Sequence, residues 1–373
     1  MNMANLIETE EERMLAGAAR RFLDDLAPVS HLRQMRDRMQ THDPDLWYQM
    51  SAMGWAGVLV PEQAGGDDMG FSAAMVIAHE LGKTLVISPF LSTSVIAATA
   101  LRQVSGSQAT EALASIASGG ITYALAIDEG AKFAPEASQL RARRDGNGYV
   151  LDGQKTFVVD GSFADRLLVL ARTDNGQTLF DLDAERPGIR RDRMKTIDSR
   201  DAATIRFDGV RADFDNVLGH FDDAMTVLAP AIRAGQAALA AEMSGLAAAA
   251  FGMTVGYLKE RRQFGVAIGS FQALQHRAAI LWSELELTAS AILNAGRMLD
   301  QDLDNAQLAV SLAKARATAT AKLAVAEAVQ MHGGIGMTDA FDIGFYMKRA
   351  RVSAEWLGDY SYHAEQIAQL RGI

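Results

Sequence analysis

Cysteine is absent from this 373-residue chain, which excludes disulfide bonds, thiolate metal sites and cysteine nucleophiles. Basic residues are in the minority, since 36 lysines and arginines stand against 46 aspartates and glutamates. The net charge of −10 leaves no general basic surface, so we expect no nucleic-acid partner. The chain also lacks a Walker loop, an HExxH helix and a GxSxG turn. Its seven scattered histidines share no ligand spacing, so we expect no metal site.

Neither a targeting segment nor a membrane span is expected. Residues 1–15 are acidic and lack the basic-then-apolar order of a signal peptide, which is compatible with a cytoplasmic location. Residues 234–258 approach membrane-spanning length, but small and polar side chains interrupt them. We therefore expect this segment to be a packed helix of a soluble core.

What the chain does contain divides into three regions. Hydrophobic residues make up 49% of the chain, which is enough for a large core. Residues 1–118 show helical spacing, residues 119–220 hold short β-rich runs, and residues 221–373 return to long helical patterns. This order predicts an α+β, mostly α protein with an N-terminal helical domain, a barrel-like or sandwich-like middle domain and a C-terminal helical bundle.

Several elements are predicted individually. Glu8–Leu26 and Leu46–Met53 show helical spacing, and a further helix over residues 75–85 is expected to close near Gly82. The middle region predicts strands in "ITYALAI", "QLRARRDGNGYVLDGQKTFVV", "RLLVLART", "TLFDLD" and "AATIRFDGV", with turns at Asp145-Gly146, Asn147-Gly148 and Asp152-Gly153. The last region predicts three long helices, Met225–Arg261, Ser270–Gln301 and Asn305–His332.

Two helix junctions contain glycine, arginine, aromatic and amide residues beyond those needed to end a helix. "QMHGGIGMT" at 330–338 is either a helix stop with Gly333 in the left-handed conformation or a loop whose amides contact a ligand. "YLKERRQFGVAIGSFQALQH" at 257–276 is either a turn between helices or an arginine, an aromatic and an amide that hold a nucleotide. The pattern alone leaves both alternatives open.

In their order and spacing, "RRQFGVAIGSFQALQHRAA" and "QMHGGIGMTDAFDIGFYMKRARV" resemble the acyl-CoA dehydrogenase family. Four further segments extend this resemblance to nearly the whole chain: "GWAGVLVPEQAGG", "ELGKTLVISPF", "LDGQKTFVVDG" and "VRADFDNVLG". The resemblance implies that family's fold, with a four-helix bundle at the C-terminus. It also implies FAD-dependent dehydrogenation of an acyl-CoA to a trans-2-enoyl-CoA, in which a carboxylate takes the α-proton and the flavin takes the β-hydrogen as hydride.

The resemblance assigns flavin contacts to residues of the two junctions. They are Arg261 at the pyrophosphate, Phe264 and Gln272 on the adenine side, and Gln330, Gly333 and Gly334 at the flavin of a neighbouring subunit. Sharing of the flavin implies an oligomer, either a homodimer, a homotetramer or an α2β2 heterotetramer with a homologous subunit. The implied substrate is an acyl-CoA, and the implied electron acceptor is an electron-transfer flavoprotein.

The middle region departs from the family pattern. The family's Thr-Glu-Pro stretch is replaced by "AIDEGAKFAPEAS". Phe157 stands where a tryptophan usually covers the flavin, and Val159 replaces a threonine whose hydroxyl meets it. Because valine has no hydroxyl to donate, this half of the flavin site is altered.

The catalytic base is a second departure. The family carries its glutamate at the position of Leu357 or at that of Gly235, and neither residue here can abstract a proton. Glu242 is the only charged side chain between Arg233 and Lys259, and it lies seven residues beyond Gly235, nearly on the same helix face. We predict that Glu242 is the base, because desolvation by apolar neighbours suits a carboxylate that acts near neutral pH.

Four alternatives stay open. Glu242 is instead paired with a cation of another helix, such as Arg277, or the base is Glu355 or Asp359. The chain is a non-catalytic partner that completes a flavin site in a homologous chain, or it is a flavin-dependent oxidase or monooxygenase on the same fold. The "AAEM-S-G" motif around Glu242 resembles a subgroup of heteromeric enzymes that act on bulky acyl-CoAs, including steroid side chains.

Overall fold

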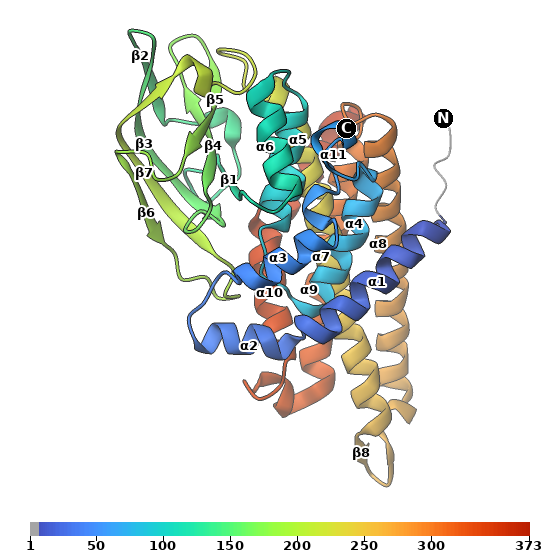
Figure 1. Cartoon of the computed structure of the whole chain (residues 1–373). Helices are drawn as coiled ribbons and strands as arrows, with labels where there is room; N and C mark the ends of the chain where they lie inside the picture. The colour runs from blue at the N-terminus through green and yellow to red at the C-terminus, as the bar shows by residue number, and fades with distance from the viewer. Residues whose placement is uncertain (1–6) are drawn as a thin grey trace. The chain divides into compact units, whose positions relative to one another are not determined.

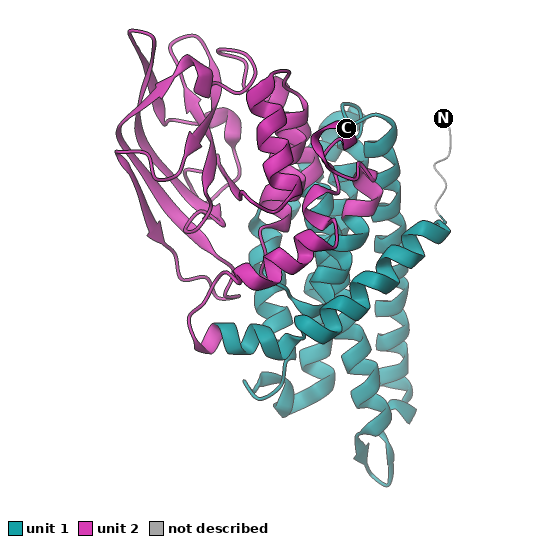
Figure 2. Ribbon diagram, in the orientation of Figure 1, with its two compact units in different colours: residues 1–35, 75–86, 236–373 teal, residues 36–74, 87–235 magenta. Residues whose placement is uncertain are grey.

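The computed structural model describes residues 7–373, which form two compact units. Unit 1 comprises the residues up to 35 together with residues 75–86 and 236–373, and unit 2 comprises residues 36–74 and 87–235 (Figure 2). Each unit is therefore assembled from segments that lie far apart in the sequence. The three-domain division at residues 118 and 220 follows composition instead, and it stays a prediction.

Unit 1 is mainly helical (Figure 2). The long helices α7 (Met225–Glu260), α8 (Gln272–Gln301) and α9 (Gln307–His332) confirm the three that helical spacing predicts. The other helices lying wholly or mostly in unit 1 are α1 (Glu10–Leu26), α2 (Val29–Asp37), α4 (Gly70–Thr84), α10 (Ile343–Glu355) and α11 (Tyr360–Arg371). α1 begins at a capping box, in which the Thr9 hydroxyl accepts from the Glu12 N–H and the Glu12 carboxylate accepts from the Thr9 N–H.

Gly82 does not close its helix, because α4 runs on to Thr84. A Cβ added at Gly82 would stand 2.0 Å from the carbonyl oxygen of Glu242 on α7. One turn further along α7, a Cβ at Gly245 would stand 1.9 Å from the carbonyl oxygen of His79. The prediction of a helix end at Gly82 was wrong because glycine serves here for close approach of two backbones inside their helices.

Unit 2 holds a seven-stranded sheet in the order β1-β4-β2-β3-β7-β6, with β5 paired to β4. The strands are β1 (Tyr123–Ala126), β2 (Arg141–Asp145), β3 (Gly148–Val159), β4 (Arg166–Arg172), β5 (Gln177–Asp183), β6 (Ile189–Arg193) and β7 (Ala202–Asp213). β1 and β2 run parallel to β4, and the other pairs are antiparallel. The sheet curls around an apolar core that includes Leu151, Leu167, Phe180, Ile205 and Val210 (Figure 1).

The sheet corrects two sequence expectations. β6 was not predicted, because four of its five residues are charged and it shows no apolar alternation. Asp152-Gly153 is not a turn but lies inside β3, where the register with β7 shifts and Gly153 takes a φ of 140°. Unit 2 also contains the helices α3 (Pro44–Ala52), α5 (Ala98–Arg102) and α6 (Ser107–Ala117) and the π-helical segment Phe90–Ala97.

One helix of the described chain, α7, is long and apolar enough to cross a membrane by length and composition. In the structure, 67% of its most apolar 18-residue window is buried inside the protein. Burial of this extent is typical of the core helix of a soluble protein.

Candidate active site

A small hairpin joins α7 to α8 and projects beyond the helices of unit 1 (Figure 1). Its strands β8 (Arg262–Gln263) and β9 (Val266–Ala267) pair around Phe264-Gly265, whose φ angles of 53° and 80° are those of a two-residue hairpin turn. Phe264 is 92% exposed, and the neighbouring predicted contacts Arg261 and Gln272 are also exposed. All three predicted contacts of this junction therefore lie on the surface of unit 1.

The second junction closes α9. Gly333 caps the helix with φ 64° and ψ −142°, so its φ is positive as predicted but its ψ lies outside the left-handed helical region. The chain continues as a 3-10 turn over Gly333–Met337. Gln330, Gly333 and Gly334, the predicted flavin contacts, are all exposed.

An aromatic cluster joins this loop to the end of α7. The ring of Tyr257 lies 4.5 Å from that of His332, which in turn lies 4.7 Å from the ring of Phe341. Tyr257 precedes Arg261 by one helical turn, and His332 precedes the glycines directly. The structure therefore brings the two predicted flavin-contact segments to the same end of unit 1.

In unit 2, Phe157 occupies a bulge of β3. The register with β7 shifts between Lys155 and Val158, and Phe157 takes a φ of 50°. Bulges of this kind turn a side chain away from the regular alternation of the strand. Phe157 is half-buried, whereas Val159 is buried and pairs with Ala202.

The segment that departs from the family's Thr-Glu-Pro pattern is organised by a buried ion pair. The carboxylate of Glu129 accepts from Lys155 Nζ at 2.6 Å and from Ser138 Oγ at 2.8 Å, and also from the N–H groups of Gln139 and Leu140. Burial lowers the pKa of Lys155, and it raises that of the adjacent Asp128 to about 7. This part of the unit therefore has its own polar core in place of the expected motif.

Within unit 1, the neighbour of one position at which the family carries its base contacts the other position. Gln236, the residue after Gly235 on α7, donates from Nε2 to the carbonyl oxygen of Leu357 at 3.0 Å. Leu357 is 1% exposed and takes a φ of 58° in the turn between α10 and α11. Neither position carries a carboxylate, so apolar and amide groups stand where the resemblance implies a base.

Glu242 lies further along α7, in the next contact with α10. Its side chain is 6% exposed, and Oε1 lies 3.5 Å from Nη1 of Arg349, which is 1% exposed. Arg349 Nη1 also donates to the Val86 carbonyl oxygen at 3.3 Å. The six residues from Gln236 to Glu242 correspond to a rise of about 9 Å along the helix. Glu242 is therefore buried, as predicted, but it belongs to an ion pair at a distance from the Leu357 turn.

The other candidate carboxylates also have partners. Glu355 pairs with Arg351 on the exposed side of α10. Asp359 accepts from the Tyr362 N–H at 2.8 Å and so caps α11. The alternative that Glu242 pairs with a cation of another helix is confirmed, but the cation is Arg349. Arg277, the example that the sequence suggested, was wrong, because it pairs with Glu327 at 2.6 Å.

Comparison with known proteins agrees with this geometry. The family models for the acyl-CoA dehydrogenase N-terminal, middle and C-terminal domains match residues 9–120, 127–210 and 225–370. The chain belongs to the acyl-CoA dehydrogenase family. Membership assigns it a flavin-dependent oxidation of a CH–CH group in an acyl-CoA, with FAD as cofactor.

Relatives of this acyl-CoA dehydrogenase span its whole length. Acyl-CoA dehydrogenase IpdE2 of Mycobacterium tuberculosis is 30% identical over 354 residues, which cover 93% of each chain. Acyl-CoA dehydrogenase FadE12 of the same organism is 28% identical over 374 residues, which cover 95% of this chain and 94% of the relative. Among solved structures, the ChsE4-ChsE5 complex from M. tuberculosis matches with a TM-score of 0.90 at 25% identity, over 99% of both chains.

The residues of this acyl-CoA dehydrogenase that face solvent at the two junctions fit FAD. The guanidinium of Arg261 has no ion-pair partner among residues 7–373, and an arginine suits a pyrophosphate. The ring of Phe264 is not used in the core of its own unit, which leaves it free to stack on an adenine. Exposed glycines at 333 and 334 allow close approach of a ligand to the backbone.

Sequence reasoning missed three features of the site. Arg349 was not singled out, although an isolated glutamate on an apolar helix is a signal that a cation faces it. Three cations in "MKRAR" were available, and the sequence does not say which points inward. Lys314, a buried lysine of α9 that donates to the Ser353 and Gly358 carbonyl oxygens beside Leu357, was not foreseen. Nor was the contact between Tyr257 and His332, because each depends on the packing of helices distant in the sequence.

Proposed function

We propose that this chain carries out FAD-dependent α,β-dehydrogenation of a bulky acyl-CoA as one subunit of an α2β2 heterotetramer, with a homologous chain as its partner. The observation that carries the proposal is the contact between Gln236 and Leu357. This contact involves no carboxylate, and neither Gly235 nor Leu357, the two family positions for the base, carries one. In this proposal the reacting carboxylate of the complex therefore comes from the homologous subunit. The ChsE4-ChsE5 relative, a complex of two named chains, is a precedent for such an assembly.

In this proposal the residues of the chain bind and orient the cofactor. Arg261 holds the pyrophosphate, Phe264 and Gln272 contact the adenine, and the loop with Gln330, Gly333 and Gly334 serves the flavin of the neighbouring subunit. Phe157 and Val159 cover the flavin from unit 2 and exclude water from it. Bound FAD supplies the two-electron acceptor for the β-hydrogen.

A second candidate keeps catalysis within this chain, with Glu242 as the base. It is favoured by the burial of that carboxylate on the helix that also carries Gln236. Against it stand the ion pair with Arg349 and the rise of about 9 Å along α7 between Gln236, which contacts Leu357, and Glu242.

The remaining parts of the proposal concern substrate, acceptor and location. The proposed substrate carries a bulky or branched acyl group, including a steroid side chain, as in the subgroup that the "AAEM-S-G" motif around Glu242 resembles. Electrons leave through an electron-transfer flavoprotein, and the protein works in the cytoplasm.

The test compares the chain purified alone with the chain co-expressed with a homologous acyl-CoA dehydrogenase. We expect the lone chain to be colourless and inactive, and the complex to be yellow and reduced by a bulky acyl-CoA from a substrate panel. A lone chain with one flavin per subunit and full activity would refute the heteromer. Glu242→Gln in the complex separates the two candidates: flavin reduction that continues favours the ion-pair role, and its loss with FAD retained favours the base.

A further inference from the structure

Lys314 is a fully buried lysine in the middle of α9. Its Nζ donates to two backbone carbonyl oxygens, that of Ser353 at 3.2 Å and that of Gly358 at 3.1 Å. These two acceptors lie on either side of Leu357, near the end of α10 and in the turn that follows it. Burial of an ammonium group costs free energy unless hydrogen bonds compensate for its lost water, so these contacts are the reason to keep a lysine here.

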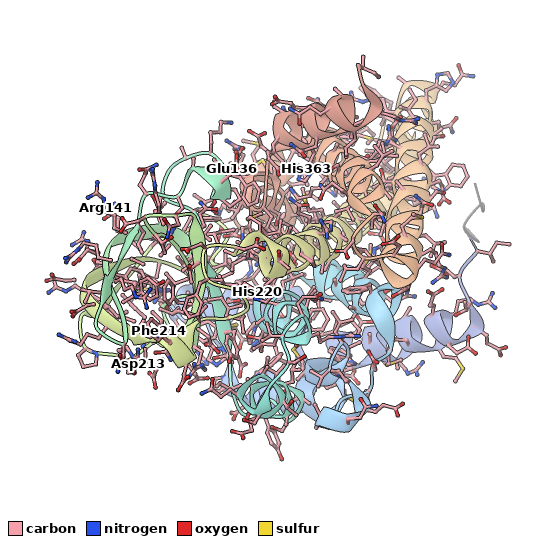
Figure 3. All side chains as sticks on the ribbon, turned by 90° about the horizontal axis from the view of Figure 1, so that it is seen from above. Glu136, Arg141, Asp213, Phe214, His220 and His363 are labelled. Atoms are coloured by element: carbon pink, nitrogen blue, oxygen red, sulfur yellow. The ribbon has the colours of Figure 1, made fainter. Side chains whose placement is uncertain are left out.

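The carbonyl of Leu357 is held as well. It accepts from Gln236 Nε2 at 3.0 Å and from His363 Nε2 at 3.2 Å. His363, labelled in Figure 3, is buried, and burial together with Lys314 lowers its pKa to about 3. The ring is therefore neutral with its proton on Nε2, and Nδ1 faces the Ser311 hydroxyl at 3.4 Å.

The turn needs this support because its backbone is strained. Leu357 takes a φ of 58°, which costs a side chain with a Cβ about 1–3 kcal/mol unless the surroundings fix it. Gly358 follows with a φ of 101°, and a Cβ there would stand 2.5 Å from the ring of Tyr362. Lys314, Gln236 and His363, from three different helices, hold the carbonyls of this segment in place.

We propose that Lys314 is a positioning residue for the dehydrogenation, because its bonds to Ser353 and Gly358 fix the Leu357 turn, where the resemblance implies that the acyl-CoA reacts. The location of the reaction rests on the proposed function, whereas the hold on the turn does not. Around the ammonium, Glu355 and Asp359 favour its charged form and the neutral ring of His363 lies nearby. Burial lowers the pKa of Lys314 to about 7.

The experiment compares Lys314→Met with Lys322→Met, the same substitution at an exposed lysine of the same helix. Both are made in the complete flavin-loaded complex. Two quantities are measured, the rate constant of flavin reduction at saturating acyl-CoA and the hydrogen exchange of the backbone amides of residues 353–360. We expect Lys314→Met to slow flavin reduction by about tenfold to a hundredfold and to speed exchange in the turn, with little change in acyl-CoA affinity or FAD content. Lys322→Met should change neither quantity.

Equal behaviour of the two variants would overturn the proposal. So would a parallel loss of FAD, of folding and of activity, because that pattern describes a general structural role. If Lys314→Met does not fold, Lys314→Gln retains one amide donor, and faster exchange confined to residues 353–360 supports the proposal, whereas unchanged exchange there overturns it. Failure of the wild-type complex to reduce its flavin with any acyl-CoA would count against the proposed function, while the exchange measurement would still test Lys314.

Discussion

α7 contacts α10 and the turn after it through two groups of polar residues, which we call layers. One layer uses neutral hydrogen-bond donors and the other uses a buried ion pair. In the Gln236 layer (Gln236, Leu357 and His363), neutral donors bind the carbonyl of a strained turn. In the Glu242 layer (Glu242, Arg349 and Val86), a carboxylate and a guanidinium are buried together, and the guanidinium also donates to the Val86 carbonyl oxygen. The three residues of the Gln236 layer thus carry no charge, and the Glu242–Arg349 ion pair lies about 9 Å further along the helix.

The difference teaches what each layer contributes. A buried ion pair adds little stability over apolar packing, yet it is costly to break from one side, so it fixes how two helices align. A strained turn held by neutral donors instead fixes a backbone at a site of chemistry. From the sequence, the isolated Glu242 on an apolar helix was predicted to be a catalytic base. In the structure it forms a buried ion pair with Arg349, which is typical of an alignment device, a contact that fixes how two helices align.

The largest expected effect comes from breaking the Glu242 layer on one side. Arg349→Met leaves the Glu242 carboxylate buried without its ion-pair partner, and we expect a loss of about 3–5 kcal/mol in the free energy of unfolding. Urea unfolding followed by circular dichroism measures it.

Removing both charges is the control for that variant. Glu242→Leu combined with Arg349→Met should recover most of the lost stability, because the buried uncompensated charge is gone. A double variant as unstable as the single one would mean that shape, not charge, holds this layer.

A smaller effect is expected from separating α4 from α7 at the Glu242 layer. Gly82→Ala adds a Cβ 2.0 Å from the Glu242 carbonyl oxygen, and the forced movement should cost about 1–3 kcal/mol. Gly252→Ala is the matched control, since Gly252 is an exposed residue of α7 whose added Cβ meets no atom within 4 Å. It should stabilise the protein by about 0.5–1 kcal/mol. Stabilisation by both variants would show that the two helices do not approach so closely.

The pH dependence of the free energy of unfolding tests the lowered pKa of Lys314, whose Nζ binds the backbone on either side of Leu357. Lys314 loses its proton at about 7 in the folded protein but near 10.5 when unfolded, so the unfolded chain binds more protons between these values. Raising the pH from 7 to 10 therefore stabilises the fold, by up to about 1.4 kcal/mol per pH unit from this group. Lys314→Met should lack this rise in urea-unfolding free energy. A wild-type curve parallel to that of the variant would contradict the depressed pKa.

The sequence predicted the fold in most of its parts because the deciding signals are local. Helical spacing identified α7, α8 and α9 to within two residues at each end. The predicted order of helices, then strands, then helices is confirmed by the structure. The errors fell where tertiary contacts override local preference. Gly82 looks like a helix end unless the approach of α7 is known, and the charged strand β6 is a strand because β7 pairs with it.

The site was predicted less completely. Family motifs predicted flavin contacts that the structure places on exposed positions, and the residue types at Leu357 and Gly235 exclude both as bases. The roles of Glu242 and of the flavin contacts themselves stay predictions. No periodicity could have found Lys314 or Arg349, because both act on backbone or side chains brought near only by packing of α9, α10 and α7.

The smallest effect is expected at the ion pair of Arg277, the residue that the sequence suggested as a partner for Glu242. Arg277 and Glu327 lie 2.6 Å apart, but their side chains are 40% and 20% exposed, so water already solvates both charges. Arg277→Met should therefore cost only about 0–1 kcal/mol, in contrast to the same substitution at Arg349. Urea unfolding in low and in 1 M salt makes the contrast sharper, since salt screens an exposed pair far more than a buried one. If the two arginines cost the same and respond equally to salt, burial is not what distinguishes the Glu242 layer, and its interpretation as an alignment device fails.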